Sequence, residues 1–144
     1  AEYPKELIVK GSKGIVLGDV WESGPEAYLG TAVHGFPNMF LIIGPNTGLG
    51  HNSMVFMIES QIEYILQSIQ LLKNSGKKKI EVKQTVQEDY NKTLQEKLKN
   101  TIWSSGCKSW YTTSTGKNTS IWPGFTFQFW WKVKHLKASD FIVE

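Results

Sequence analysis

The chain has 144 residues, a length that fits one domain with its own core and excludes a large multidomain enzyme within these residues. Its net charge is +3 and every basic residue is a lysine, whereas nucleic-acid-binding proteins more often use arginine for two-point contacts to phosphate and guanine. Cys107 is the only cysteine, which excludes an internal disulfide and a cysteine-based metal site. We find no signal-peptide pattern and no membrane-spanning run, so we expect a cytoplasmic protein without nucleic-acid or membrane partners.

The first third of the chain predicts short strands separated by turns. Residues 6–20 alternate weakly between apolar and polar, which predicts a β-hairpin that turns near Ser12-Lys13-Gly14. The run Met39 to Ile43 is apolar throughout and stops at Gly44-Pro45. A short apolar run between turn residues is typical of a strand buried on both faces, as in a parallel sheet.

A long helix is predicted after the loop of residues 44–53. Apolar residues recur at three- and four-residue spacing and form one face of this helix: Ile58, Ile62, Ile65, Leu66, Ile69 and Leu72. Ser53 or Asn52 can cap its start, and Gly76 can end it in the left-handed conformation.

The second half of the chain predicts a short strand at Ile80 to Lys83 and a helix from about Gln84 to Asn100. The apolar side of this helix is thin, so we expect it on the surface. Phe125 to Phe129 alternates strictly between aromatic and polar residues, which predicts a strand. The expected fold is therefore α/β, with short strands around one long helix, a second amphipathic helix and a tryptophan-rich irregular tail.

The loop of residues 44–53 is the segment with the clearest potential for chemistry. A strand, a glycine-rich loop and a helix in this order bring a helix N-terminus to the end of a sheet, where unpaired N–H groups favour an anion or a polarised oxygen. Small residues allow a ligand to approach the backbone closely. The loop has neither a dinucleotide-binding fingerprint nor a P-loop pattern, so these features alone leave open a turn that serves only the fold.

Several strings resemble Baeyer–Villiger flavin monooxygenases in the same order along nearly the whole chain. They are Ala27 to Thr31, Gly35 to Phe40, Gly44 to Thr47, Gly50 to Ser53, Glu59 with Gln61, Trp103 to Cys107, Ser109 to Tyr111 and Asn118 to Phe125. The resemblance implies a C-terminal portion of an enzyme that uses FAD and NADPH to insert one oxygen atom from O2 into a ketone or aldehyde. It also implies that residues 1–76 return to the FAD-binding domain and that residues 77–144 cover the nucleotide and substrate side.

The resemblance further assigns roles to single residues. The implied cofactor-binding residues are Gly44, Pro45, Asn46, Asn52, Ser53, Met54 and Trp110. Leu49 and His51 are implied to line the substrate cavity. We interpret His34 and His135 as structural, Cys107 as an inert thiol, and we expect no metal site.

Parts that such enzymes need are missing from the chain. It has no glycine-rich dinucleotide fingerprint and no arginine, so no catalytic residue of the family lies within it. We therefore expect a fragment that lacks tightly bound cofactor, is inactive alone, self-associates, and has the remainder of the parent enzyme and a small carbonyl substrate as its partners. A heteroatom-oxidising or N-hydroxylating flavin monooxygenase, and a non-catalytic binding or assembly module, are the alternative hypotheses.

Overall fold

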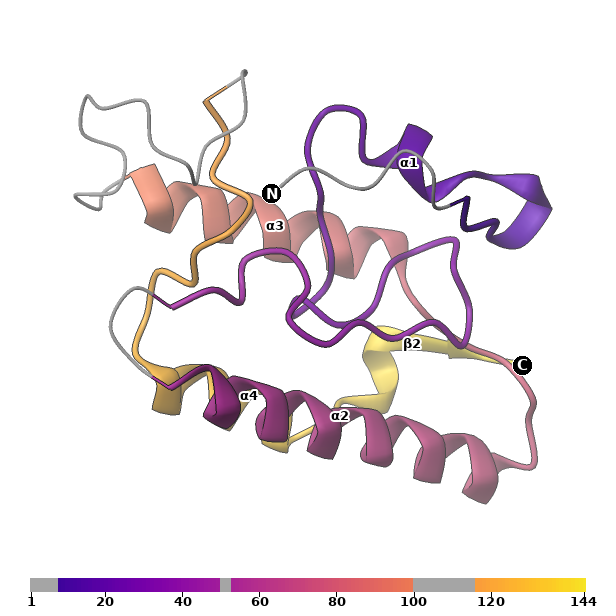
Figure 1. Cartoon of the computed structure of the whole chain (residues 1–144). Helices are drawn as coiled ribbons and strands as arrows, with labels where there is room; N and C mark the ends of the chain where they lie inside the picture. Colours follow the sequence, from indigo (N-terminus) through magenta and orange to yellow (C-terminus); the bar gives the residue numbers. More distant parts are fainter. Residues whose placement is uncertain (1–7, 50–52, 100–115) are drawn as a thin grey trace.

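The computed structural model of the protein describes residues 8–49, 53–99 and 116–144. Helix α2 (Met54–Ser75) and helix α3 (Gln84–Lys99) lie on opposite sides of a loop-rich layer formed mainly by residues that precede α2 (Figure 1). Helix α4 (Thr126–Lys134) packs directly against α2. The two long helices confirm the sequence-based predictions, because α2 starts after Ser53 and ends at Gly76 with a left-handed φ of 65°.

A small antiparallel sheet joins the end of the chain to the segment between α2 and α3. Strand β1 (Ile80–Val82) pairs with β2 (Phe141–Val143), with Ile80 opposite Val143. A two-stranded sheet is marginal alone, so its stability depends on packing. Ile80, Val82 and Phe141 supply that packing, because all three are buried in the main core. The predicted strand at Ile80 to Lys83 is confirmed.

The N-terminal segment forms the predicted turn but not the predicted hairpin. Residues Ser12–Gly14 form the short 3-10 helix η1, and a single antiparallel bridge joins Lys10 to Val16. The second arm of the expected hairpin becomes the short helix α1 (Leu17–Val20). Leu17, with Val33 and Phe36, belongs to a second small core, so packing of this side chain accompanies the helical turn.

The expected strand at residues 39–43 is wrong for the chain as described. Only an isolated bridge between Ala32 and Phe40 forms there, and the neighbouring backbone turns left-handed at Asn38 and at Ile43. Ile42 and Ile43 are 49% and 40% exposed. A strand buried on both faces needs sheet neighbours, and the described residues supply none for this run.

The expected strand at residues 125–129 is also wrong, because α4 occupies this segment. The Oε1 atom of Gln128 accepts a hydrogen bond from the Phe125 N–H at 3.1 Å and so caps the helix start. Phe129 and Val133, four residues apart, are both fully buried, whereas Phe127 is 61% exposed. The five-residue alternation was too short a window to reveal this helical spacing.

The main core lies between α2, α3, α4 and the small sheet. Its buried members are Leu29, Ala32, Met57, Tyr64, Ile80, Val82, Leu94, Leu98, Trp122, Phe129, Val133 and Phe141. Leu94 and Leu98 bring the thin apolar side of α3 into this core, and the opposite side of α3 faces solvent. In the described part of the chain, no helix has the length and apolar character that crossing a membrane requires.

Candidate functional site: the loop before helix α2

The described part of the loop, residues 44–49, bonds to residues 118–122, and Ile43 just before it bonds to α2. On one side the backbone pairs with residues 118–122: the Asn46 N–H donates to Thr119 O at 2.9 Å and the Gly48 N–H to Ser120 O at 2.7 Å. In return, the Trp122 N–H donates to Gly48 O at 2.9 Å. The loop is thus anchored by a segment that lies some seventy residues later in the chain.

Asn46 holds the centre of this contact. Its side chain is 2% exposed, and its Nδ2 atom donates to Asn118 O at 2.9 Å and to Ile121 O at 3.1 Å. Its φ is 57°, a left-handed conformation that asparagine tolerates better than most residues. The donors of Asn46 therefore bind the protein itself, and the described contacts give this residue a structural role beside its predicted cofactor role.

Gln61 of α2 fixes the other side of the loop. Its Oε1 accepts the Ile43 N–H at 2.9 Å, and its Nε2 donates to Gly30 O at 3.0 Å and to Thr31 Oγ1 at 2.9 Å. Gln61 is fully buried, so these bonds form away from water and are costly to leave unmade. Sequence reasoning noted Gln61 only as part of a matched string. No local signal in the sequence pointed to this role, because a polar residue opposite an apolar stripe is ordinarily expected to face solvent.

Two glycines of the loop allow chain segments to approach one another. A Cβ at Gly44 would collide with the carbonyl oxygen of Gly30. A Cβ at Gly48 would lie 2.6 Å from Ser120 O, which is closer than real Cβ contacts. The small residues of the loop thus serve internal packing, which is the alternative that the sequence left open beside ligand approach.

The start of α2 is the helix end for which the sequence predicts a ligand-binding role. Ser53 is the exposed N-cap in an extended conformation, and Met54 begins a helix of 22 residues. The first turn contains no acidic residue, so the positive end of the helix dipole is not neutralised from within that turn. Ser53 and Met54 therefore fit the role of stabilising negative charge near the loop.

The structure describes six of the nine predicted site residues. Gly44, Pro45, Asn46 and Leu49 lie in the anchored loop, and Ser53 and Met54 lie at the helix start. The predicted residues His51, Asn52 and Trp110, together with Cys107, lie outside the described residues. Within the described ranges, no group of three or more His, Cys, Asp or Glu side chains is placed to hold a metal ion.

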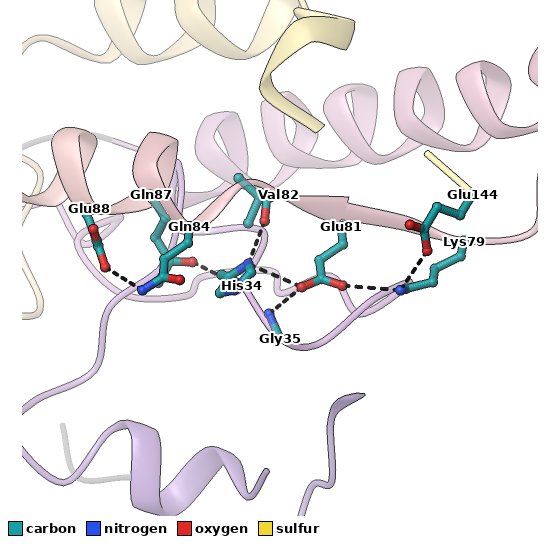
Figure 2. A network of polar contacts seen from close by, with 9 residues as sticks. All are labelled: His34, Gly35, Lys79, Glu81, Val82, Gln84, Gln87, Glu88 and Glu144. Atoms are coloured by element: carbon teal, nitrogen blue, oxygen red, sulfur yellow. Dashed lines mark hydrogen bonds and ion pairs between the residues drawn. The ribbon is translucent and has the colours of Figure 1, made fainter. Parts of the chain in front are cut away.

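A second polar cluster lies on the side of the loop layer next to β1 and α3, and Figure 2 shows it. The buried carboxylate of Glu81 accepts the Gly35 N–H at 2.8 Å and lies 3.1 Å from His34 Nδ1. Its other oxygen lies 3.7 Å from Lys79 Nζ. A buried carboxylate is stable only with such partners, so Glu81 joins β1 to the loop at residues 34–35.

His34 extends this cluster to α3. Its backbone N–H donates to Gln87 Oε1 at 2.7 Å, and its Nδ1 lies 3.0 Å from Val82 O (Figure 2). Because Val82 O and the Glu81 carboxylate are both acceptors, Nδ1 carries the hydrogen. These bonds agree with the predicted structural role of His34. At the edge of the cluster, the hydrogen bond to Glu144 raises the pKa of Lys79 above its ordinary value, and Glu81 adds to this effect.

Three tyrosines lie in the interior near α3 and β2. The Tyr28 hydroxyl donates to Asp140 Oδ2 at 2.6 Å, and its ring packs edge-on against Tyr90. Burial raises the pKa of Tyr28, Tyr64 and Tyr90 well above the ordinary value, with the bond to Asp140 as a further cause for Tyr28. The hydroxyl of Tyr90 is buried without a hydrogen-bond partner among the described residues.

Comparison with known proteins gives these features a context. No family model matches the chain. A Pseudomonas aeruginosa protein named Baeyer–Villiger monooxygenase is 52% identical over 93% of this chain, which covers 26% of that protein. A Streptomyces coelicolor protein of the same name is 38% identical over 94% of this chain and 26% of its own length.

Comparison with solved structures also finds similarity to monooxygenases. A solved cyclohexanone monooxygenase from a Rhodococcus species, bound to NADP+, matches 96% of this chain and 27% of its own, with a TM-score of 0.81 and 25% identity. The resemblance to Baeyer–Villiger monooxygenases is confirmed. The chain spans about a quarter of the length of the Baeyer–Villiger monooxygenases that it matches. Its mixture of one long helix, a second helix and short strands corresponds to a portion of such a structure.

Proposed function

We propose that this chain is a portion of an FAD- and NADPH-dependent monooxygenase that inserts one oxygen atom from O2 into a ketone or aldehyde. The observation that carries the proposal is the 52% identity over 93% of the chain to the Pseudomonas aeruginosa Baeyer–Villiger monooxygenase. A further relative from Aspergillus niger is named an FAD-binding monooxygenase and is 35% identical over the whole chain. These names favour carbonyl oxygenation over the heteroatom-oxidising alternative and over a non-catalytic module.

The proposed part of this chain in the reaction is to position and to stabilise. FAD reduced by NADPH supplies the electrons that activate O2. The backbone N–H groups at Ser53 and Met54, at the positive end of α2, would stabilise negative charge on the ring edge of the bound flavin. Gly44, Pro45, Asn46 and Asn52 would complete that wall. Leu49 and His51 would line the substrate cavity, and Trp110 would cover the nucleotide.

Buried hydrogen bonds before and after the described loop residues support this assignment. Asn46 ties the loop to residues 118–122, and Gln61 ties α2 to Gly30 and Ile43. A site that stabilises developing charge has to be held in position before the reaction, because reorganisation during the reaction costs rate. The proposed division into residues 1–76 and 77–144 places this loop in the FAD-facing part.

A graft tests the proposal. This chain replaces the matching quarter of the Pseudomonas aeruginosa relative, and the purified protein is examined for bound flavin and for ketone-dependent oxidation of NADPH. We expect both, because the chain supplies the same wall as the segment it replaces. A folded graft that binds no flavin would contradict the proposal, and a graft without residues 1–144 or their counterpart is the control.

The isolated chain has its own expected behaviour. We propose that the 144 residues alone bind no flavin tightly, oxidise no NADPH above background and self-associate, with a cytoplasmic location for the whole enzyme. The visible absorption spectrum measures bound flavin, and light scattering measures self-association. A clean monomer at high concentration would contradict self-association, and a yellow protein would contradict the loss of cofactor.

A further inference from the structure

Helix α2 buries a face of mixed polarity and exposes an apolar one. The inward face consists of Met57, Ser60, Gln61, Tyr64 and Ser68, all buried. The outward face carries a stripe at three- and four-residue spacing, made of Val55, Ile58, Ile62, Leu66 and Ile69. Val55 is 60%, Leu66 60% and Ile69 52% exposed. The apolar face that the sequence predicted is therefore only partly covered: Leu72 packs against the core, whereas Ile62, Leu66 and Ile69 are exposed.

The stripe is too long and too regular to be scattered surface residues. From residue 55 to residue 69 it extends for about 21 Å along the helix at about 1.5 Å per residue. Single exposed apolar side chains are ordinary on proteins, but a continuous row over four helical turns marks a surface that meets something.

A second exposed apolar pair, Ile42–Ile43, lies on another side of α2. The Ile43 N–H bonds to Gln61 Oε1, and Gln61 belongs to the buried inward face. Within the described chain, the run of residues 39–43 is paired only by an isolated bridge at Phe40. The pair is therefore separate from the stripe.

Helix α4 does not cover the stripe. Its contact with α2 runs through Gln67, which donates to Val133 O at 3.0 Å and accepts the Leu136 N–H at 3.1 Å. Gln67 is one residue after Leu66, and successive residues of a helix point about 100° apart, so α4 lies on a different side of α2.

We infer that the surface formed by Val55, Ile58, Ile62, Leu66 and Ile69 is an internal packing surface, covered in the longer enzyme by polypeptide from its other three quarters. The inference rests on the proposed function. The length of the relatives supports this occupant, since the chain corresponds to only 26% of them and the rest must contact it somewhere. An apolar, uncharged stripe fits a permanent intramolecular contact better than a transient partner, whose interfaces are more polar.

The test compares the isolated 144-residue chain with the graft. Leu66→Cys is introduced in both proteins, and the rate of alkylation at position 66 is measured by mass spectrometry at low protein concentration. The matched control is Glu63→Cys, an exposed polar position three residues earlier on the same helix. We expect alkylation at position 66 to be at least about tenfold slower in the graft than in the isolated chain, since a buried thiol reacts only through local opening.

Each outcome separates the inference from the function on which it rests. Equal alkylation at position 66 in both proteins overturns the inference, even when the graft binds flavin and oxidises NADPH. Protection that depends on protein concentration and accompanies dimerisation of the graft also overturns it, because the occupant is then a second copy. Protection at position 66 in a monomeric graft that lacks activity supports the inference and leaves the proposed function as the claim that failed.

Discussion

Asn46 combines a strained backbone with buried hydrogen bonds at the centre of the loop. Replacing it with alanine removes the donors to Asn118 O and Ile121 O and leaves a left-handed φ of 57° on a residue that disfavours it. We expect Asn46→Ala to lower the free energy of unfolding by about 2–4 kcal/mol, measured by urea denaturation. Asn46→Gly should recover only about 1 kcal/mol of this loss, because glycine relieves φ but restores no donor. Full recovery in the glycine variant would show that the amide bonds contribute nothing.

Gly44 and Gly76 form a matched pair for the effect of close packing. A Cβ at Gly44 meets the backbone of Gly30, which cannot move aside as a flexible side chain would. A Cβ at Gly76 meets nothing within 4 Å, although its φ is 65°. Gly44→Ala should therefore cost more than about 2 kcal/mol of unfolding free energy, and Gly76→Ala about 1 kcal/mol. Equal losses in denaturation experiments would contradict the close approach of the loop to Gly30.

Tyr90 and Tyr28 differ in the satisfaction of their hydroxyl groups. The Tyr90 hydroxyl is buried without a described partner, so Tyr90→Phe should leave the stability at neutral pH unchanged or raise it by about 1 kcal/mol. Tyr28→Phe loses the bond to Asp140 and should cost about 1–3 kcal/mol. Thermal unfolding of the two variants side by side decides the matter, and a loss in Tyr90→Phe as large as that in Tyr28→Phe would be the contrary result.

The same tyrosines predict how stability depends on pH. Burial raises the pKa of Tyr90, so above the ordinary value of 10.0 the unfolded chain releases a proton that the native state keeps. The unfolded state then binds fewer protons, and the free energy of unfolding falls as pH rises from 10. The contribution is fully present below pH 10. Tyr90→Phe should flatten this alkaline decline in a series of denaturation curves, whereas an unchanged slope would contradict the burial of the hydroxyl.

At the scale of elements, α4 shows that a helix and a strand would bury different members of the same set of aromatic residues. A strand would place Phe125, Phe127 and Phe129 on one face, whereas the helix buries only Phe129 of the three. We expect Phe129→Ala to cost about 3–5 kcal/mol and Phe127→Ala to change stability by less than about 0.5 kcal/mol in the isolated chain. Similar losses in both variants, measured by denaturation, would favour the strand.

Elements that the sequence predicted correctly are those with long periodic patterns or clear end signals. Helix α2 has six apolar positions at helical spacing and Gly76 at its end. Helix α3 also has apolar positions at helical spacing, over four turns. Residues 39–43 and 125–129 were misassigned because five residues cannot distinguish a strand from a helix or a loop. For residues 39–43 the local pattern also demands sheet neighbours, and these are absent from the described chain.

The loop before α2 was located correctly, but its internal bonds could not be read from the sequence. The resemblance placed Asn46 at a cofactor, whereas its contacts to Asn118 and Ile121 depend on a chain crossing that spacing does not encode. The same holds for the hydrogen bonds of Gln61, whose partners lie 18 to 31 residues away, and for the bond between Glu81 and Gly35, which are 46 residues apart. Long-range partners of single polar residues leave no local signal in one sequence.

At the scale of the whole molecule, the apolar residues form both an internal core and an exposed surface that is suited to contact with further polypeptide. Its own core lies between α2, α3 and α4, and the outward stripe of α2 leaves a second apolar surface open. This arrangement agrees with a chain that matches about a quarter of its relatives and has no dinucleotide fingerprint. The start of α2 would then be one wall of a site whose other walls come from the rest of the enzyme.

The most direct measurement of the central claim is the origin of the oxygen atom in the product of the grafted enzyme. The graft is supplied with NADPH, a ketone and isotopically labelled O2, and the product is examined by mass spectrometry. The account predicts an ester that carries one labelled oxygen atom, as the unaltered Pseudomonas aeruginosa relative should give under the same conditions. A folded, flavin-containing graft that consumes NADPH but forms no labelled ester would contradict it.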